Sequence, residues 1–104
     1  MTARRMQREL MTDKNAPRSL SAVKAMAKEL GFTVEPLIYG QEPNVCGAQF
    51  RGFAYVVTVF YKRTPADRWR FREASADGAM DHEPLHTPTE LRDRLQSIAQ
   101  AGQS

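Results

Sequence analysis

The segment 50–72 constrains the fold more than any other part of the chain. Two runs rich in aromatic and β-branched residues, 50–63 and 68–72, flank the sequence Thr64-Pro65-Ala66-Asp67. Such residues favour strands, and a Pro-containing break between two of these runs predicts a β-hairpin. Most of the aromatic residues of the chain, and six of its basic residues, lie in this segment. We therefore expect the hairpin to supply much of the core and much of the surface charge.

The position of the turn determines which side chains share a face of the sheet. With a turn centred on residues 65–66, Phe60 lies opposite Phe71, and the face that carries both of them with Trp69 is expected to form the core. The other face is predicted to be aromatic and basic. It is the expected binding surface, with these residues: Arg51, Phe53, Tyr55, Tyr61, Arg63, Arg68, Arg70 and Arg72. A slip of one residue in the turn would exchange the two faces.

Two helices are predicted, one on each side of this hairpin in the sequence. Residues 19–30 place apolar side chains at three- and four-residue spacing, and Gly31 suits the left-handed residue that ends a helix. The second helix, residues 88–101, follows a capping box made by Thr87 and Glu90, with proline at the first helical position.

The remaining segments complete an α+β fold in the order helix, strand, hairpin, helix. Residues 32–35 alternate as a strand does, residues 40–47 have the composition of a loop, and a fourth short strand beginning at residues 79–80 is left open. The simplest way to bury both helical stripes is a three- to four-stranded antiparallel sheet with the helices packed on one face. Residues 17–104 are expected to form this single domain, preceded by a basic N-terminal arm or short helix over residues 1–16.

Size and composition indicate a globular cytoplasmic protein. The 104 residues suffice for one modest core, and an apolar content of 41% argues against wholesale disorder. Cys46 is the only cysteine, so an intramolecular disulfide is excluded and a reducing compartment is favoured. The first residues contain no apolar stretch of the kind that a secretory signal needs, and no apolar run is long enough to cross a bilayer. We expect no engagement of a membrane.

Charge is unevenly distributed although the net charge is only +3. Residues 1–31 carry seven Lys or Arg against three Asp or Glu, and residues 50–72 carry six against one. Residues 73–95 carry two against six. This asymmetry favours an anionic partner, and the alternative is a solvated surface with no partner.

Residues 51–58, Arg-Gly-Phe-Ala-Tyr-Val-Val-Thr, resemble the octapeptide of RNA-recognition motifs, whose aromatic side chains stack on bases. Thr58 stands where that octapeptide has an aromatic residue, and residues 40–49 are too few for the helix that precedes this strand in the family. The helix–sheet–helix order is also similar to that of double-stranded-RNA-binding domains, whose second helix begins with lysines. Here it begins Pro88-Thr89-Glu90, so we expect shared topology only.

Motifs for catalysis or metal binding are weak. The stretch His82-Glu83-Pro84-Leu85-His86 satisfies the H-E-x-x-H pattern of zinc proteases, which requires a helix, and its proline opposes one. Cys46 lacks the flanking residues of a nucleophile, and the glycines do not cluster as in a phosphate-binding loop. A structural metal site made by Cys46, His82 and His86 is the remaining alternative. We expect no catalytic residue, no metal and no cofactor, hence no enzyme.

The prediction that follows is a non-catalytic binding protein: a small regulator, inhibitor or assembly subunit that engages a protein partner through the basic aromatic face. Exposed Tyr and Arg suit protein interfaces, and the low net charge ranks an acidic protein slightly ahead of a nucleic acid. The alternative is a nucleic-acid-binding module that uses the same face and the N-terminal arm. Such a chain would also suit an accessory protein of a phage or mobile element, and a homo-oligomer is left open.

Overall fold

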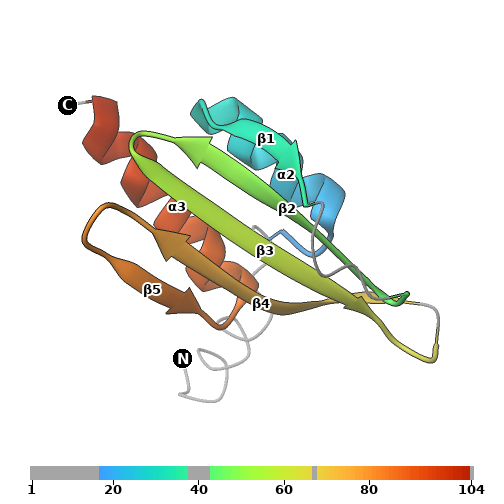
Figure 1. Cartoon of the computed structure of the whole chain (residues 1–104). Coiled ribbons are helices and arrows are strands. Elements are labelled where there is room, and N and C mark those ends of the chain that lie inside the picture. The colour runs from blue at the N-terminus through green and yellow to red at the C-terminus, as the bar shows by residue number, and fades with distance from the viewer. Residues whose placement is uncertain (1–16, 38–42, 67, 104) are drawn as a thin grey trace, which may run out of the picture.

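The computed structural model describes residues 17–37, 43–66 and 68–103. Its elements follow the order helix, five strands, helix, and the strands form one antiparallel sheet in which each pairs with its neighbour in sequence (Figure 1). The elements are α2 (Leu20–Leu30), β1 (Thr33–Pro36), β2 (Val45–Gly52), β3 (Tyr55–Arg63), β4 (Trp69–Asp77), β5 (His82–Leu85) and α3 (Pro88–Gln103). The α+β class is confirmed, with five strands in place of three or four. The expected N-terminal arm or short helix over residues 1–16 lies outside the described residues.

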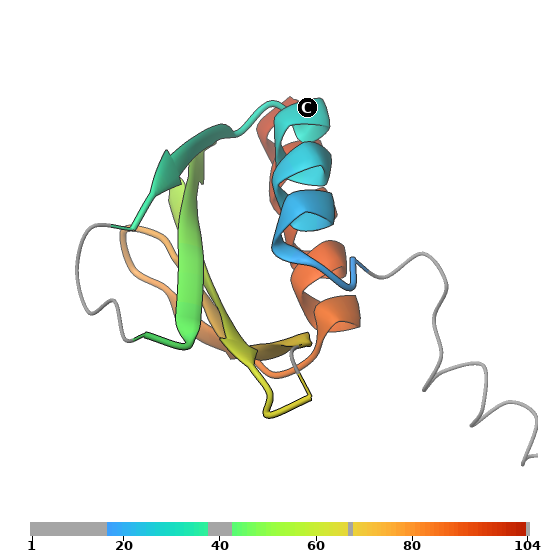
Figure 2. The same cartoon turned by 90° about the vertical axis from the view of Figure 1, so that its right-hand side faces the viewer.

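Both helices cover the same face of the sheet, as Figure 2 shows, and this expectation is confirmed. α2 contacts β1 and β2, α3 contacts β4 and β5, and the two helices contact each other. The core between the layers takes two small or medium side chains from α2 and four residues from α3: Val23, Ala27, Leu91, Leu95, Ile98 and Ala99. Neither helix is long and apolar enough, within the described residues, to cross a membrane.

Caps fix the helix ends as the sequence predicts. The Ser19 side chain accepts a hydrogen bond from the Ala22 backbone at 3.1 Å, and Gly31 ends α2 with φ at 103°. At the start of α3 the Glu90 backbone donates to Thr87 Oγ1 at 3.1 Å. The Glu90 carboxylate in turn accepts a hydrogen bond from the backbone of His86 at 2.6 Å, one residue earlier than in the usual capping box.

The run predicted as one long strand contains a turn of its own. β2 ends at Gly52 and β3 begins at Tyr55, and the two residues between them, Phe53 and Ala54, have φ of 53° and 65°. Two-residue hairpin turns need positive φ, which Asn and Gly adopt most easily, so this sequence gives no turn signal. The Phe53 ring packs edge-on against Phe32, with centroids 5.2 Å apart, and this contact offsets the cost of the positive φ. This unrecognised hairpin accounts for one of the additional strands.

Other boundaries also differ from the sequence prediction: β4 runs to Asp77 and not to residue 72, and α3 runs to Gln103 and not to residue 101. Residues 40–47 were expected as a loop, but β2 already begins at Val45. The last strand runs over His82–Leu85, whereas Ala79 and Met80 lie before it in the connection from β4. Since β5 contains Pro84 and only four residues, it had little strand signal and is an edge strand, where proline is tolerated.

The expected register of the β3–β4 hairpin is wrong, and with it the assignment of the two faces. Tyr61 pairs with Phe71, and Phe60 pairs with Glu73, so Arg72 is an extra residue in a β-bulge. The side chains that face the helices therefore include Tyr61, which is fully buried, and not Phe60. Trp69, expected in the core, is 42% exposed. Phe71, also expected in the core, is partly buried and packs against the edge of the core.

Tyr61 is the largest fully buried side chain of the described residues. Its ring meets Phe71 edge-on at 5.9 Å, and its hydroxyl donates a hydrogen bond to the carbonyl of Pro17 at 3.3 Å. Burial, with a smaller contribution from Cys46, raises the pKa of Tyr61 to about 12. The side chain of Tyr61 thus links Pro17, in the segment before α2, to β3, the central strand of the sheet.

Replacing Ala54 by Gly should stabilise the protein. A β-carbon at positive φ costs free energy that glycine avoids, and part of this gain is lost to the greater freedom of glycine in the unfolded chain. We expect a net gain of about 0.5–1 kcal/mol in urea unfolding. The matched control is Ala25→Gly on the exposed side of α2, where the same change should cost about 1 kcal/mol. A loss at both positions would contradict the assigned turn.

Ionisation of Tyr61 should make the protein less stable at alkaline pH. An exposed tyrosine ionises near pH 10, and the buried one has a pKa of about 12. Between these values the unfolded state loses its proton first, so stability that is complete below about pH 10 falls as the pH rises, by about 1–3 kcal/mol. Urea unfolding at about pH 9 and about pH 11.5 measures the fall. Tyr61→Phe should reduce the fall because it removes the buried phenol, and an equal fall in wild type and Tyr61→Phe would refute the assignment.

Candidate binding site on a basic hairpin arm

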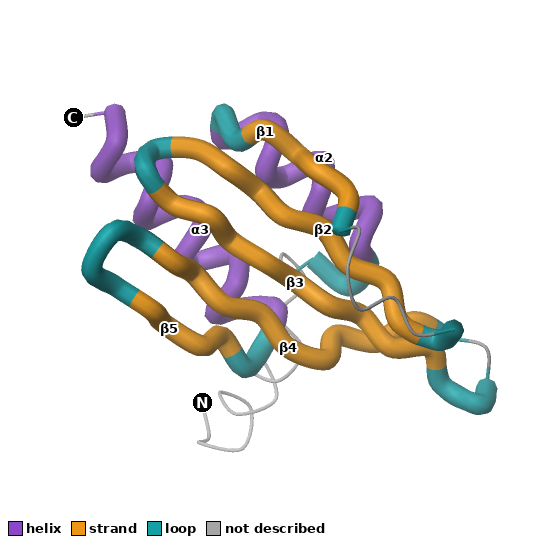
Figure 3. Tube along the Cα trace, viewed as in Figure 1, coloured by secondary structure: helices purple, strands orange, loops and turns teal. Residues whose placement is uncertain are grey.

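The β3–β4 hairpin extends past both helices at one end of the sheet (Figures 1 and 3). We call residues 62–66 and 68–72 the basic arm. The last two residues of β3 are exposed, and the first five residues of β4 are exposed except for Phe71, which is half-buried. Residues 74–77 of β4, by contrast, alternate between buried and half-buried beneath the helices. The arm therefore presents most of its side chains to solvent at the end of the sheet.

The arm concentrates cations: Lys62, Arg63, Arg68, Arg70 and Arg72. The register places Lys62 directly opposite Arg70, and like charges facing each other across two strands destabilise a hairpin. None of the described residues forms an ion pair with the side chain of Lys62, Arg68 or Arg70. The fold thus tolerates a local electrostatic cost at the Lys62–Arg70 pair.

An apolar hollow lies beside these cations. It has a volume of about 300 Å³ and is lined by Lys62, Arg63, Thr64, Pro65, Arg70, Phe71 and Arg72. Its surface is mainly apolar, as is expected where hydrocarbon stems of Lys and Arg and ring atoms of Phe and Pro line a hollow. The hollow can therefore hold an apolar group within reach of several positive charges.

The outer edge of β4 is open along the arm. β5 pairs with β4 only over residues 74–77, so no described strand lies on the outer side of β4 over residues 69–73, while on its inner side Trp69, Arg70, Phe71 and Glu73 pair with β3. The outer strands of the sheet each contain a proline, Pro36 in β1 and Pro84 in β5, which blunts them as pairing surfaces. Residues 69–73 contain none.

The structure brings together four of the eight predicted binding residues: Arg63, Arg68, Arg70 and Arg72 all lie on the arm. Arg51 lies on β2, on the face away from the helices, and its Nε is 3.3 Å from a carboxylate oxygen of Glu35. Two residues that the sequence prediction missed, Lys62 and Trp69, complete the arm. Lys62 could have been found from its position beside Arg63, but Trp69 could not, since large aromatic residues usually enter the core.

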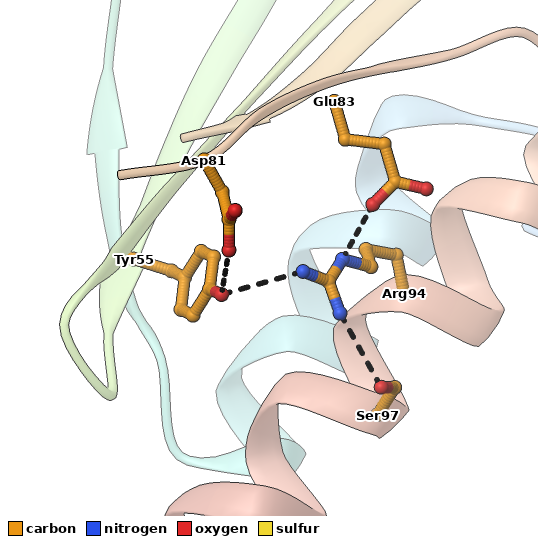
Figure 4. A network of polar contacts seen from close by, with 5 residues as sticks. All are labelled: Tyr55, Asp81, Glu83, Arg94 and Ser97. Atoms are coloured by element: carbon orange, nitrogen blue, oxygen red, sulfur yellow. Dashed lines mark hydrogen bonds and ion pairs between the residues drawn. The ribbon is translucent and has the colours of Figure 1, made fainter. Parts of the chain in front are cut away.

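The predicted aromatic residues lie elsewhere. Phe53 packs in its turn and Tyr61 is in the core. Tyr55 begins β3 and belongs to a polar network, shown in Figure 4, that includes neither of them. The three residues therefore do not form one exposed aromatic face with the arginines.

The network joins the start of β3 to the turn before β5 and to α3. The Tyr55 hydroxyl donates to Asp81 Oδ2 at 3.0 Å and accepts from Arg94 Nη2 at 3.4 Å, while the guanidinium carbon lies 5.2 Å from the ring centroid (Figure 4). Arg94 Nε is 2.9 Å from Glu83 Oε2, and Nη1 donates to Ser97 at 3.5 Å. Because Nε lacks a well-aligned hydrogen bond, the contact with Glu83 is an ion pair only. These partners give Tyr55 a structural task.

The candidate metal ligands and the cysteine are not assembled into a site. The H-E-x-x-H pentapeptide forms β5 and the residue after it, not a helix, and His82 contacts Asp77. Over the part of the chain that the structure describes, no three His, Cys, Asp or Glu side chains gather as metal ligands do. Cys46 is half-buried on β2, and burial raises the pKa of its thiol against the opposing effect of Lys24, so the reactive thiolate is disfavoured.

Comparison with known proteins adds no relative: no protein-family model, no curated protein and no solved structure matches this chain. The candidate site therefore depends on its own geometry.

Reversing one charge on the arm should stabilise the fold. Arg70→Glu converts a like-charged cross-strand pair with Lys62 into an attractive one, and such a pair is worth about 0.2–1 kcal/mol. We expect a higher unfolding midpoint. In the control, Arg51→Glu removes an ion pair and places two carboxylates together, so that variant should be slightly less stable. Destabilisation by Arg70→Glu would show that this arginine supports the fold.

Proposed function

We propose that this protein is a non-catalytic binding protein whose basic arm engages an acidic region of a protein partner, in the role of a regulator, inhibitor or assembly subunit. The observation that carries the proposal is the placement of Lys62 opposite Arg70 on an exposed arm. That pair costs stability, and none of the described carboxylates offsets it. An anionic partner would convert this cost into a gain on binding.

Three features of the arm together support a protein partner. Its arginines and the 42% exposed Trp69 are residue types that dominate binding energy at protein interfaces. The hollow beside Phe71 suits an apolar side chain, and the open edge of residues 69–73 carries backbone donors and acceptors. A protein segment supplies carboxylates, apolar groups and a backbone at once. The proposed surface thus moves from the aromatic face expected from sequence to the end of the hairpin.

A nucleic acid is the second candidate, favoured by the density of cations on the arm. Five Lys or Arg side chains within eleven residues could contact several phosphates, and Trp69 could stack on a base. Neither contact would use the open strand edge, which is why we rank this class second. A cytoplasmic location and an origin in a phage or mobile element are parts of the proposal that rest on the sequence.

A charge-reversal pair with a matched control tests the proposal. Tagged wild-type protein, the double variant Arg68→Glu/Arg70→Glu and the control Arg51→Glu are each incubated with nuclease-treated extract of the native cells, and bound proteins are identified by mass spectrometry. We expect wild type and Arg51→Glu to retain the same acidic partner, and the double variant to lose it without any fall in its melting temperature.

The same three proteins are titrated with labelled single- and double-stranded oligonucleotides at rising salt. Tight binding that weakens steeply with salt, and that the double variant loses, would favour nucleic acid. Together with an extract from which no protein is retained, it would overturn the protein-partner proposal.

A further inference from the structure

We propose that residues 69–73 of β4 form a docking edge, at which an extended acidic segment of the partner adds as a further antiparallel or parallel strand. This inference depends on the proposed function and specifies how the partner binds. β5 pairs with β4 over residues 74–77 and not over residues 69–73, whereas β2 pairs with β3 as far as Lys62. The sheet is therefore stepped, and the outer side of the arm is the place where one more strand fits without displacing any described element.

The length of the open edge suits this mode of binding. Five residues of strand extend for about 17 Å, close to the length of an ordinary strand in a globular protein. An exposed strand of this length presents backbone groups that another extended chain can pair with. The bulge at Arg72 lies within the edge, and bulges near binding sites commonly redirect a side chain.

The positive charge beside residues 69–73 determines which kind of strand can pair with this edge. Arg68, Arg70 and Arg72 flank the open backbone, so pairing of this edge with the same edge of a second copy would bring two rows of arginines together. Repulsion disfavours that dimer and any other basic strand, while an acidic strand gains attraction. The arginines would thus protect the edge against self-association and select its partner.

Protection alone does not explain the rest of the surface. A single charge or proline would suffice to blunt an edge, as Pro36 and Pro84 do at the outer strands. The arm instead exposes 42% of Trp69 and places an apolar hollow of about 300 Å³ beside Phe71. Strand addition uses such features, because backbone hydrogen bonds give affinity and pockets for alternate side chains give specificity.

The chemistry of the partner segment follows from these contacts. Side chains of a strand alternate between two faces, so carboxylates at every second position can reach the arginines while apolar residues between them reach the hollow and Trp69. The segment must offer a backbone N–H at each position that pairs with β4, so proline is excluded there and is tolerated only where its nitrogen faces away from the sheet. We therefore expect an extended sequence in which acidic and apolar residues alternate.

Two peptides of equal charge test the inference. Both fluorescently labelled peptides have four Glu-Val repeats, and in the second peptide every backbone nitrogen is methylated, which keeps the carboxylates but removes every backbone donor. Losing two or three backbone hydrogen bonds should weaken binding about tenfold or more. We expect the unmethylated peptide to bind correspondingly tighter by fluorescence anisotropy and to slow amide hydrogen exchange within residues 69–73. The Arg68→Glu/Arg70→Glu variant should bind neither.

Other outcomes separate this inference from the proposed function. Equal affinity for both peptides, with no change in exchange over residues 69–73, would overturn strand addition and leave a purely electrostatic protein-binding arm. Failure of both peptides would also overturn strand addition, while the proposed function stands if the extract still yields a partner that depends on Arg68 and Arg70. Binding of oligonucleotides alone would overturn both.

Discussion

The pairing of Tyr61 with Phe71 is the constraint on which the rest of the structure depends. It places Tyr61 beneath the helices, where its hydroxyl reaches Pro17, and leaves Arg72 as the extra residue of a bulge. Before the bulge, β4 presents Trp69 and Arg70 to solvent, and after it Ala74 and Ala76 are buried. One irregularity in the β3–β4 ladder thus separates a part of the hairpin that builds the core from a part that is exposed to solvent.

The helices and the fold class could be predicted because their signals are local. Ser19, Gly31 and Thr87 mark helix ends through contacts made within a few residues. The register could not be predicted, because β3 has apolar side chains on both faces and either face could have been the core. The turn at Phe53 and Ala54 was hidden for a different reason: tertiary packing on Phe32 holds residues whose local preference opposes the conformation.

The residue types of the candidate site could be predicted from the sequence, but the place of the site in the fold could not. The clustering of arginines in the segment was visible in sequence, but their separation from Tyr55 and Tyr61 depends on the bulge and on the contacts of Arg94. Sequence reasoning paired exposed aromatics with exposed charges, whereas the protein uses both tyrosines structurally. The other parts of the proposed binding surface are Trp69 and a stretch of backbone, and a strand edge leaves no composition signal by which it could be found.

The sheet order has a consequence for how the chain tolerates change in length. Every strand pairs with its neighbour in sequence, so each pairing closes only a short loop, while α2 and α3 meet from the two ends of the described chain. The entropy of closing a loop grows slowly with its length. The connection between β1 and β2, and the tip of the arm, join strands already held in register by their ladders. These are the places where insertions should affect the architecture least, and at the arm tip they would alter the proposed binding surface.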